Sequence, residues 1–286
     1  MSIIKLLLGA YILISATHVI AAPYAATVVN EKTGEILHCE NCDVRQHPAG
    51  LTKLLTLYIA FEAIESGEVG LDDHVTISQN SASEPPLKIG LRSGQKIKLR
   101  YLLRGAGVAG ANDAATAIAE YISGSEARFA RRMNETSKRL GMTRSTWKNA
   151  HGLRQSGHLS TAIDMAILVQ AHRRDFPEYY NLFSRITDDA GIRQVTNSGR
   201  RYLANKHVDF FKHGYTRAAG FNGAAVTTIR KKSAITIVFG GRSTASRDAQ
   251  IFRLTQKYIE VMPANGGPSM RPALRYLFPL ENKRIE

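Results

Sequence analysis

The chain has 286 residues, of which 44% are hydrophobic and 22% charged, a composition typical of a globular protein with one or two domains. Its 38 Lys and Arg residues against 24 Asp and Glu residues give a formal net charge of +14, which favours an anionic partner. Two cysteines are too few for a disulfide-rich small fold or a four-cysteine zinc module, and no apolar run after the N-terminus is long enough to span a membrane.

The N-terminus predicts export. Lys5 is followed by an apolar stretch over residues 6–15, and small residues precede a cleavage expected after Ala21. We therefore expect residues 1–21 to be a signal peptide, with an uncleaved anchor as the alternative. Export to the periplasm or cell envelope disfavours a nucleic-acid partner, so the positive charge is interpreted as contact with an anionic envelope surface.

Hydrophobic periodicity and turn residues predict a chain that alternates strands with helices. In chain order we expect strands at 24–30 and 35–38, a long helix from 48 to 67, a strand at 75–78, a strand leading into a helical turn at 98–105, helices at 113–122, 126–140, 161–173 and 176–184, paired strands at 221–230 and 233–239 joined by Lys231 and Lys232, and a helix at 243–261. This order predicts an α+β fold with a mixed antiparallel sheet, built from both chain ends and flanked by helices. Residues 22–262 form the expected domain and 263–286 a C-terminal tail.

Several short segments, in a fixed order, carry residues typical of acyl-transfer sites. They read PAGLTK at 48–53, GAND at 110–113 and KHGYTR at 212–217, with GEVGLDD at 67–73 and NAHGL at 149–153. Together they resemble the motifs of serine-type D-alanyl-D-alanine carboxypeptidases in the penicillin-binding-protein superfamily. The resemblance covers nearly the whole chain after the signal peptide, and it implies a β-lactamase/transpeptidase-like fold.

The resemblance also implies catalytic roles for four positions. Gly50 stands at the position of the nucleophilic serine, at the start of a helix, and Lys53 follows three residues later at the position of the base. Gly110 stands at the position of a second, proton-relaying serine, and Asn112 at that of the asparagine that binds the substrate amide. Lys53 and Asn112 also have structural alternatives, as a buried amine bonded to an amide and carbonyls, and as the cap of a helix.

The third segment implies a substrate-binding strand. Lys212, His213 and Gly214 stand at a K-T-G motif, whose lysine attracts the terminal carboxylate of the substrate, and Tyr215 and Arg217 follow. His213 replaces the threonine of that motif, and the alternative for it is a neutral residue that fills space.

Two hydroxyl groups on the proton path are missing. Glycine has no side chain, so Gly50 cannot form an acyl-enzyme and Gly110 cannot relay a proton. Loss of the nucleophile alone costs on the order of 10⁶ in rate in a related serine mechanism. We therefore predict an exported, catalytically inactive homologue that binds a peptidoglycan stem peptide or a cell-wall enzyme, with no cofactor and no metal.

Two other functions stay open from the sequence. The first is an active carboxypeptidase or related hydrolase that uses a non-standard nucleophile, such as Thr52 or a water activated by Lys53. The second is a protein-interaction scaffold of the envelope. The basic and aromatic segment 271–280 offers a further peripheral contact with an anionic envelope surface.

Cys39 and Cys42 form a C-x-x-C motif shortly before the long helix. Three interpretations compete: a structural disulfide, a redox-active pair, and a metal site completed by His38 and His47. We predict the disulfide, because an exported protein folds in an oxidising compartment.

Overall fold

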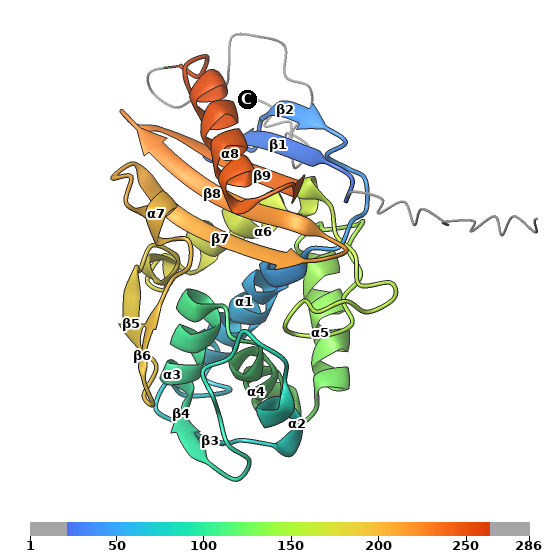
Figure 1. Ribbon diagram of the computed structural model, residues 1–286, viewed down its shortest axis with the longest axis vertical. Helices are drawn as coiled ribbons and strands as arrows, with labels where there is room; N and C mark the ends of the chain where they lie inside the picture. The colour runs from blue at the N-terminus through green and yellow to red at the C-terminus, as the bar shows by residue number, and fades with distance from the viewer. Residues whose placement is uncertain (1–21, 264–286) are drawn as a thin grey trace, which may run out of the picture.

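The computed structural model describes residues 22–263 (Figure 1). The predicted signal peptide at 1–21, the tail beyond residue 263 and the basic segment 271–280 lie outside the described residues. Among the residues that the structure describes, none of the helices has the length and apolar character needed to cross a membrane.

A five-stranded antiparallel sheet forms one half of the molecule, with strand order β2-β1-β9-β8-β7. Its strands are β1 (Ala25–Asn30), β2 (Ile36–Glu40), β7 (Val208–Thr216), β8 (Gly220–Ile229) and β9 (Lys232–Gly241). The early strand β1 pairs with the late strand β9, with Ala25 opposite Phe239. The prediction of a sheet assembled from both ends of the domain is thus confirmed, and β7 is left as an edge strand.

Helices cover both faces of this sheet (Figure 1). On one face α8 (Thr244–Ile259) packs against side chains that include Val28 and Val238, and on the other α6 (Ala162–Asp175) packs against side chains that include Val29 and Ile237. Successive side chains of a strand point to opposite faces, so β1, which is buried along its whole length, contributes to both cores. Thr161 and Ser243 cap the starts of α6 and α8 through their hydroxyl groups.

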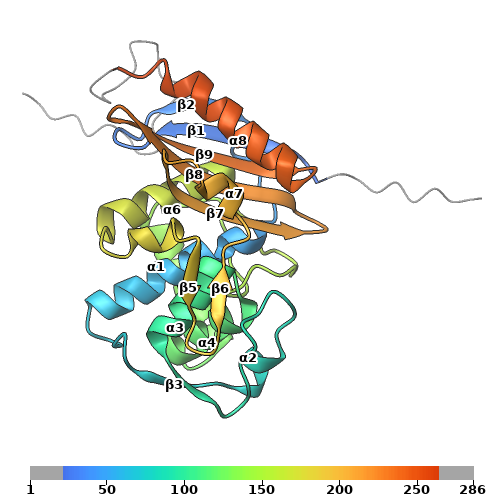
Figure 2. The same cartoon turned by 60° about the vertical axis from the view of Figure 1, so that its left-hand side comes forward.

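A helical lobe lies below the sheet (Figures 1 and 2). It comprises η1 (Ala49–Leu51), α1 (Thr52–Glu65), β3 (His74–Thr76), α2 (Gln79–Ser83), β4 (Lys96–Lys98), α3 (Leu99–Arg104), the π-helical turn η2 (Gly105–Ala109), α4 (Asn112–Ser123) and α5 (Glu126–Arg139). Helix α1 is buried along nearly its whole length, because it runs between the sheet and the other helices of the lobe.

The structure corrects several sequence-based predictions. Most of segment 98–105 is helical, and 176–184 contains only the short turn η3 (Tyr180–Phe183). The sequence analysis missed the hairpin of β5 (Thr187–Asp189) and β6 (Gln194–Thr196), which lies beside α3, the short helix α7 (Arg200–Leu203) and the first half of β7 (Figure 2). These elements are short or flank a glycine-containing motif, so their periodicity is weak.

The turn between β8 and β9 lies one residue earlier than predicted. Arg230 and Lys231 are its central residues, with φ of +48° and +70°. Two left-handed residues in a two-residue loop match the right-handed twist of the strands, although neither residue is a glycine or an asparagine.

Cys39 and Cys42 are joined by a disulfide bond. Cys39 is exposed at the end of β2 and Cys42 is buried in the turn that follows. Nδ1 of His38 lies 3.2 Å from the hydroxyl oxygen of Tyr258. His47 contacts the carbonyl oxygen of His158. The two histidines therefore have other partners, and the disulfide is the interpretation that agrees with the structure.

Candidate functional site

A pocket of about 370 Å³ lies where the edge strand β7 meets the helical lobe. It is lined by Gly50, Lys53, Pro86, Leu87, Gly107, Val108, Ala109, Gly110, Asn112, His151, Gly152, Leu153, Asn197, Ser198, Phe211, Lys212, His213, Gly214, Tyr215 and Thr216. All three sequence motifs thus meet in one hollow. The lining includes two lysines and no carboxylate, which favours an anionic or polar ligand.

Gly50 lies in η1, where the chain enters α1, and β7 packs directly onto its backbone. A Cβ atom on Gly50 would lie 2.9 Å from the carbonyl oxygen of His213 and 3.0 Å from the α-carbon of Gly214. Both obstacles are backbone atoms of a strand, which cannot turn aside as a flexible side chain can. The nucleophile position is therefore without a side chain and without the space for one.

Lys53 is buried at the start of α1. Its Nζ donates hydrogen bonds to Asn112 Oδ1 and to the carbonyl oxygen of His151, both at 2.7 Å. Burial lowers the pKa of Lys53 to about 7, although the negative charges of Glu84 and Asp113 oppose this shift. The structural alternative for Lys53, an amine bonded to an amide and a carbonyl, describes these contacts.

Position 110 is a left-handed turn between η2 and α4. Gly110 has a φ of +73°, a conformation that glycine adopts without strain and that serine does not. Asn112 begins α4, but the N-cap residue is Ala111, and the Asn112 amide instead donates to the carbonyl oxygen of Pro85 at 2.9 Å. The capping alternative for Asn112 is therefore wrong, and its side chain joins Lys53 to the loop that follows α2.

Lys212 lies on β7 with its amine buried. Its Nζ donates to the carbonyl oxygens of Ala106 and Gly107, at 2.7 and 2.6 Å, in the π-helical turn η2. Burial, with a further contribution from the positive charge of Lys53, lowers the pKa of Lys212 well below 10.5. Lys212 lines the pocket, but its amine holds the sheet edge onto the helical lobe.

Of the predicted binding residues that follow Lys212, His213 and Tyr215 line the pocket and Arg217 does not. His213 lines the pocket, with Nε2 3.0 Å from Ser198 Oγ. Tyr215 also lines it, 56% exposed and packed on Phe221. Arg217 is exposed in the turn after β7 and is not among the residues that line this pocket, so its place among the substrate-binding residues stays a prediction.

Thr52, the alternative nucleophile considered from the sequence, faces away from the pocket. Its side chain is fully buried, and Oγ1 lies 2.8 Å from Nε2 of His158. Burial lowers the pKa of His158 to about 4. This pair is a packing contact beneath η1, because neither residue lines the pocket.

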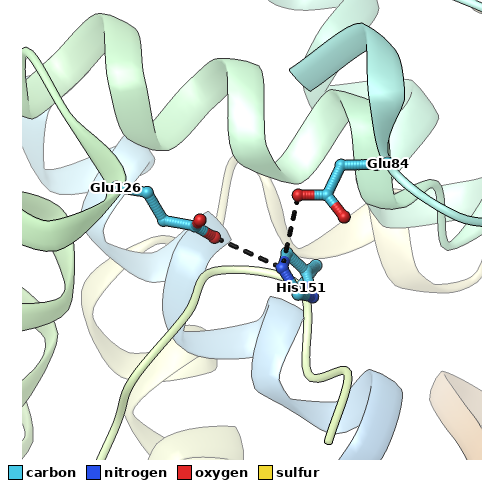
Figure 3. Close-up of side chains that lie close together, drawn as sticks. All are labelled: Glu84, Glu126 and His151. Carbon is cyan, nitrogen blue, oxygen red and sulfur yellow. Dashed lines mark ion pairs between the residues drawn. The ribbon is translucent and has the colours of Figure 1, made fainter. Parts of the chain in front are cut away.

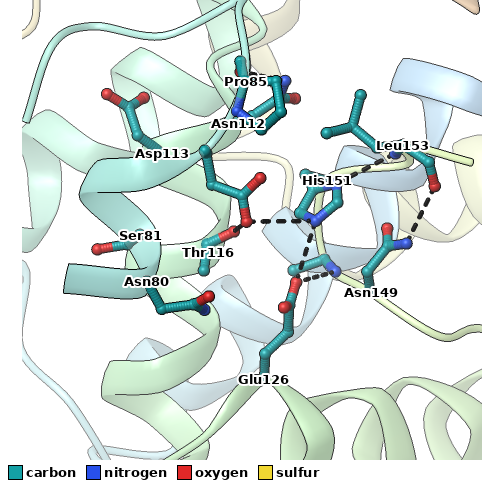
Figure 4. Close-up of polar contacts among 12 residues, drawn as sticks. Asn80, Ser81, Pro85, Asn112, Asp113, Thr116, Glu126, Asn149, His151 and Leu153 are labelled. Carbon is teal, nitrogen blue, oxygen red and sulfur yellow. Dashed lines mark hydrogen bonds and ion pairs between the residues drawn. The ribbon is translucent and has the colours of Figure 1, made fainter. Parts of the chain in front are cut away.

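Behind the pocket, His151 lies between two glutamates (Figure 3). Its Nε2 is 3.4 Å from Glu84 Oε1 and 3.3 Å from Glu126 Oε1. Glu84 also accepts from Thr116, and Glu126 from the backbone N–H of Ala150 (Figure 4). Burial raises the pKa of both carboxyl groups, and burial with the charge of Lys53 lowers the pKa of His151 to about 3.

The hydrogen bonds of His151 decide what this cluster can hold. Its Nδ1 accepts from the backbone N–H of Leu153 at 3.1 Å, so the ring proton is on Nε2 and points toward the two carboxylates. A metal bound at Nε2 would move that proton to Nδ1, against the amide of Leu153. One ligand atom from each of the three side chains lies within 4.8 Å of the other two, as in a metal site. The N–H group at Nε2 of His151 nevertheless points toward the two carboxylates, so the arrangement fits a proton held between these groups better than a metal ion.

Sequence reasoning missed several residues in or next to the pocket. The carbonyls of Ala106 and Gly107 are backbone groups, which no residue pattern reveals. Ser198 belongs to a loop without a motif, and Glu84 and Glu126 lie 42 positions apart in sequence. His151 was inside a segment noted for its resemblance, but nothing in the sequence assigned it a role.

An antiparallel sheet packed on a helical lobe, with one lysine in the first turn of the helix under the sheet edge and another on that edge, defines a penicillin-binding-protein-like domain. The sequence profile of Peptidase_S11, D-alanyl-D-alanine carboxypeptidase, matches residues 14–243. The chain belongs to this family.

Known proteins similar to this chain agree with the assignment. The D-alanyl-D-alanine carboxypeptidase DacF of Bacillus subtilis is 33% identical over 235 residues, which cover 80% of this chain and 60% of the relative. DacA of Escherichia coli is 33% identical over 234 residues, 79% and 58% of the two chains. Penicillin binding protein 5 from Haemophilus influenzae superposes with a TM-score of 0.78 and 30% identity, over 82% of this chain and 69% of that one. The chain spans about three fifths of the length of these curated relatives.

Proposed function

We propose that this protein is a D-alanyl-D-alanine carboxypeptidase homologue that binds a peptidoglycan stem peptide in its pocket without cutting it at the family's nucleophile position. The observation that carries the proposal is the contact between Gly50 and β7. Position 50 has no hydroxyl group, and a side chain there would meet the backbone of His213 and Gly214. An acyl-enzyme at this position would need both a new residue and a displaced strand.

The rest of the pocket supports peptide binding. Within residues 22–263, the edge strand β7 has a neighbouring strand on one side alone, so an extended peptide can add to its other side through backbone hydrogen bonds. Tyr215 offers an exposed aromatic surface at the same edge. Lys53 and Lys212 line the pocket, and a terminal carboxylate bound beside their buried amines would favour the protonated, positively charged form of each.

The proposed location is the cell envelope, where such peptides occur. It rests on the predicted signal peptide at residues 1–21 and on the net charge of +14, which suits an anionic envelope. A cell-wall enzyme is the alternative partner in the cell envelope, and it would bind at the edge strand β7.

Calorimetric titration with a synthetic stem peptide ending in D-Ala-D-Ala tests this proposal. We expect a dissociation constant in the micromolar to millimolar range and no release of D-alanine. The same peptide with an amidated C-terminus is expected to bind about tenfold more weakly, since the interaction between its carboxylate and the two amines is lost.

Tyr215→Ala is expected to weaken binding, because it removes exposed aromatic surface from the pocket edge. Phe252→Ala is the matched control, since Phe252 is 45% exposed on α8 and outside this pocket. A titration that stays flat up to millimolar peptide would overturn the proposal. Release of D-alanine would favour the active hydrolase instead.

A further inference from the structure

A second cavity, of about 240 Å³, lies on the face of the sheet that α8 covers, opposite the face that packs on the helical lobe (Figure 1). It is lined by Tyr202, Asn205, His207, Thr227, Ile229, Phe252, Thr255 and Gln256. None of these residues lines the pocket of the proposed function. A cavity of about 150 Å³ holds a benzene ring, and pockets for drug-sized ligands measure about 300–1,000 Å³, so this cavity has room for one substituted six-membered ring.

Three elements place the lining side chains. On α8, two of the lining residues follow the first at spacings of three and four, so all of them share one face of the helix. On β8, Thr227 and Ile229 point to the same side of the sheet as Ala225, which packs in the core beneath α8. The remaining lining residues belong to α7 and to its connection with β7. The cavity is therefore built on regular elements of the sheet half of the molecule.

Two aromatic rings line the cavity. Phe252 is 45% exposed, and it and Tyr215 are the exposed residues among the phenylalanines, tyrosines and tryptophan of residues 22–263. The ring of Tyr202 stacks on Phe211, with centroids 4.6 Å apart, which fixes its orientation beside the cavity. The face of an aromatic ring carries partial negative charge and attracts weakly positive C–H groups, as well as excluding water from an apolar surface.

Uncharged polar groups complete the lining. Asn205 Oδ1 accepts a hydrogen bond from the backbone N–H of His207 at 3.1 Å, which holds the amide in place and leaves Nδ2 to donate to a ligand. Thr255 Oγ1 is buried 2.7 Å from Thr236 Oγ1, and Gln256 is exposed. The described residues that line the cavity include no aspartate, glutamate, lysine or arginine. This lining suits a ligand with hydroxyl or amide groups and offers no counter-charge to a phosphate or carboxylate.

We propose that this cavity binds a neutral sugar ring, such as one unit of a glycan, with the ring packed against Phe252 and Tyr202 and its hydroxyl groups bonded to Asn205 and Gln256. A sugar ring has a face of C–H groups and a rim of hydroxyl groups, which match the two kinds of lining. A wholly apolar ring would take the amides out of water without giving them a partner. The inference goes beyond the proposed function, because the cavity, its residues and its ligand class are all different.

Calorimetric titration of the purified protein with two tetrasaccharides tests the inference. The probes are the β-1,4-linked tetramer of N-acetylglucosamine and cellotetraose, its counterpart built from glucose. We expect at least one of them to bind with a dissociation constant of about 0.1–10 mM. Addition of the synthetic stem peptide is expected to leave that constant unchanged, because the peptide is proposed to occupy the other pocket.

Two substitutions on α8 locate the sugar. Phe252→Ala is expected to weaken binding about tenfold, since it removes the exposed aromatic face, and Gln256→Ala about threefold, since it removes one hydrogen-bonding amide. Both side chains are exposed, so neither substitution empties the core, and thermal unfolding checks that each variant is folded. Ile192→Ala is the matched control: Ile192 is 40% exposed between β5 and β6, outside this cavity, and its variant should bind as the unchanged protein does.

Three results would overturn the inference. They are no binding of either tetrasaccharide up to about 10 mM, binding that Phe252→Ala leaves unchanged, and displacement of the sugar by the stem peptide, which would place both ligands in the first pocket. Peptide binding without sugar binding overturns only this inference. Sugar binding without peptide binding overturns only the proposed function.

Discussion

Replacing Gly50 with serine is expected to leave residue 50 unacylated by benzylpenicillin and to lower the free energy of unfolding by about 1–3 kcal/mol. The hydroxyl group returns, but the Cβ atom that carries it would lie 2.9 Å from the carbonyl oxygen of His213. The strand or the helix start has to shift to make room, so stability falls without restoring the geometry of the family. Intact mass and urea unfolding measure the two effects.

Gly50→Ala separates the two parts of this prediction. It introduces the same Cβ atom without the hydroxyl group, so it should destabilise the protein about as much as Gly50→Ser. Gly214→Ala should destabilise it more, because its Cβ atom would meet the backbone nitrogen and α-carbon of Gly50. Ala204→Ser, at an exposed position after α7, should change little. Rapid acylation at residue 50 in Gly50→Ser would show that β7 yields easily, and would contradict this account.

Lys53→Met is expected to remove a pH dependence of stability between about pH 7 and pH 10. In the unfolded chain the lysine takes up its proton near its ordinary pKa of 10.5, whereas in the folded protein burial lowers that pKa to about 7. In this window the unfolded state binds more protons, so the stability of the unchanged protein rises with pH, by at most about 1.4 kcal/mol per pH unit. The methionine variant lacks this contribution.

Urea midpoints of both proteins at several pH values measure the effect as a difference, which cancels the other titrating groups that the two proteins share. The stability of the unchanged protein minus that of Lys53→Met should grow from pH 7 to pH 10. Lys206→Met is the matched control: its amine is exposed in the folded protein, and its difference curve should be flat. A flat curve for Lys53→Met would mean that water reaches the buried amine.

The sequence correctly predicted two kinds of feature: strands that a local residue pattern identifies, and a contact between residues of two different motifs. Short stretches rich in β-branched and apolar residues, bounded by turn residues, identified the strands β1, β8 and β9. The contact of Lys53 with Asn112 was proposed as an alternative from the resemblance, although the residues are 59 positions apart. In contrast, the first half of the edge strand β7 was missed, and its second half was expected only from the resemblance, since its glycine and polar residues weaken the pattern.

The sequence by itself determined which groups are missing: a glycine at positions 50 and 110 cannot supply a hydroxyl group in any fold. It also determined the family and the order of most of the longer elements, because both follow from residue identity along the chain. Only the tertiary structure decided that β7 fills the space beside Gly50, that the amine of Lys212 bonds to carbonyls of η2, and that Ser198 meets His213. These contacts join residues far apart in sequence, and their distances depend on how the sheet packs against the helical lobe and its loops.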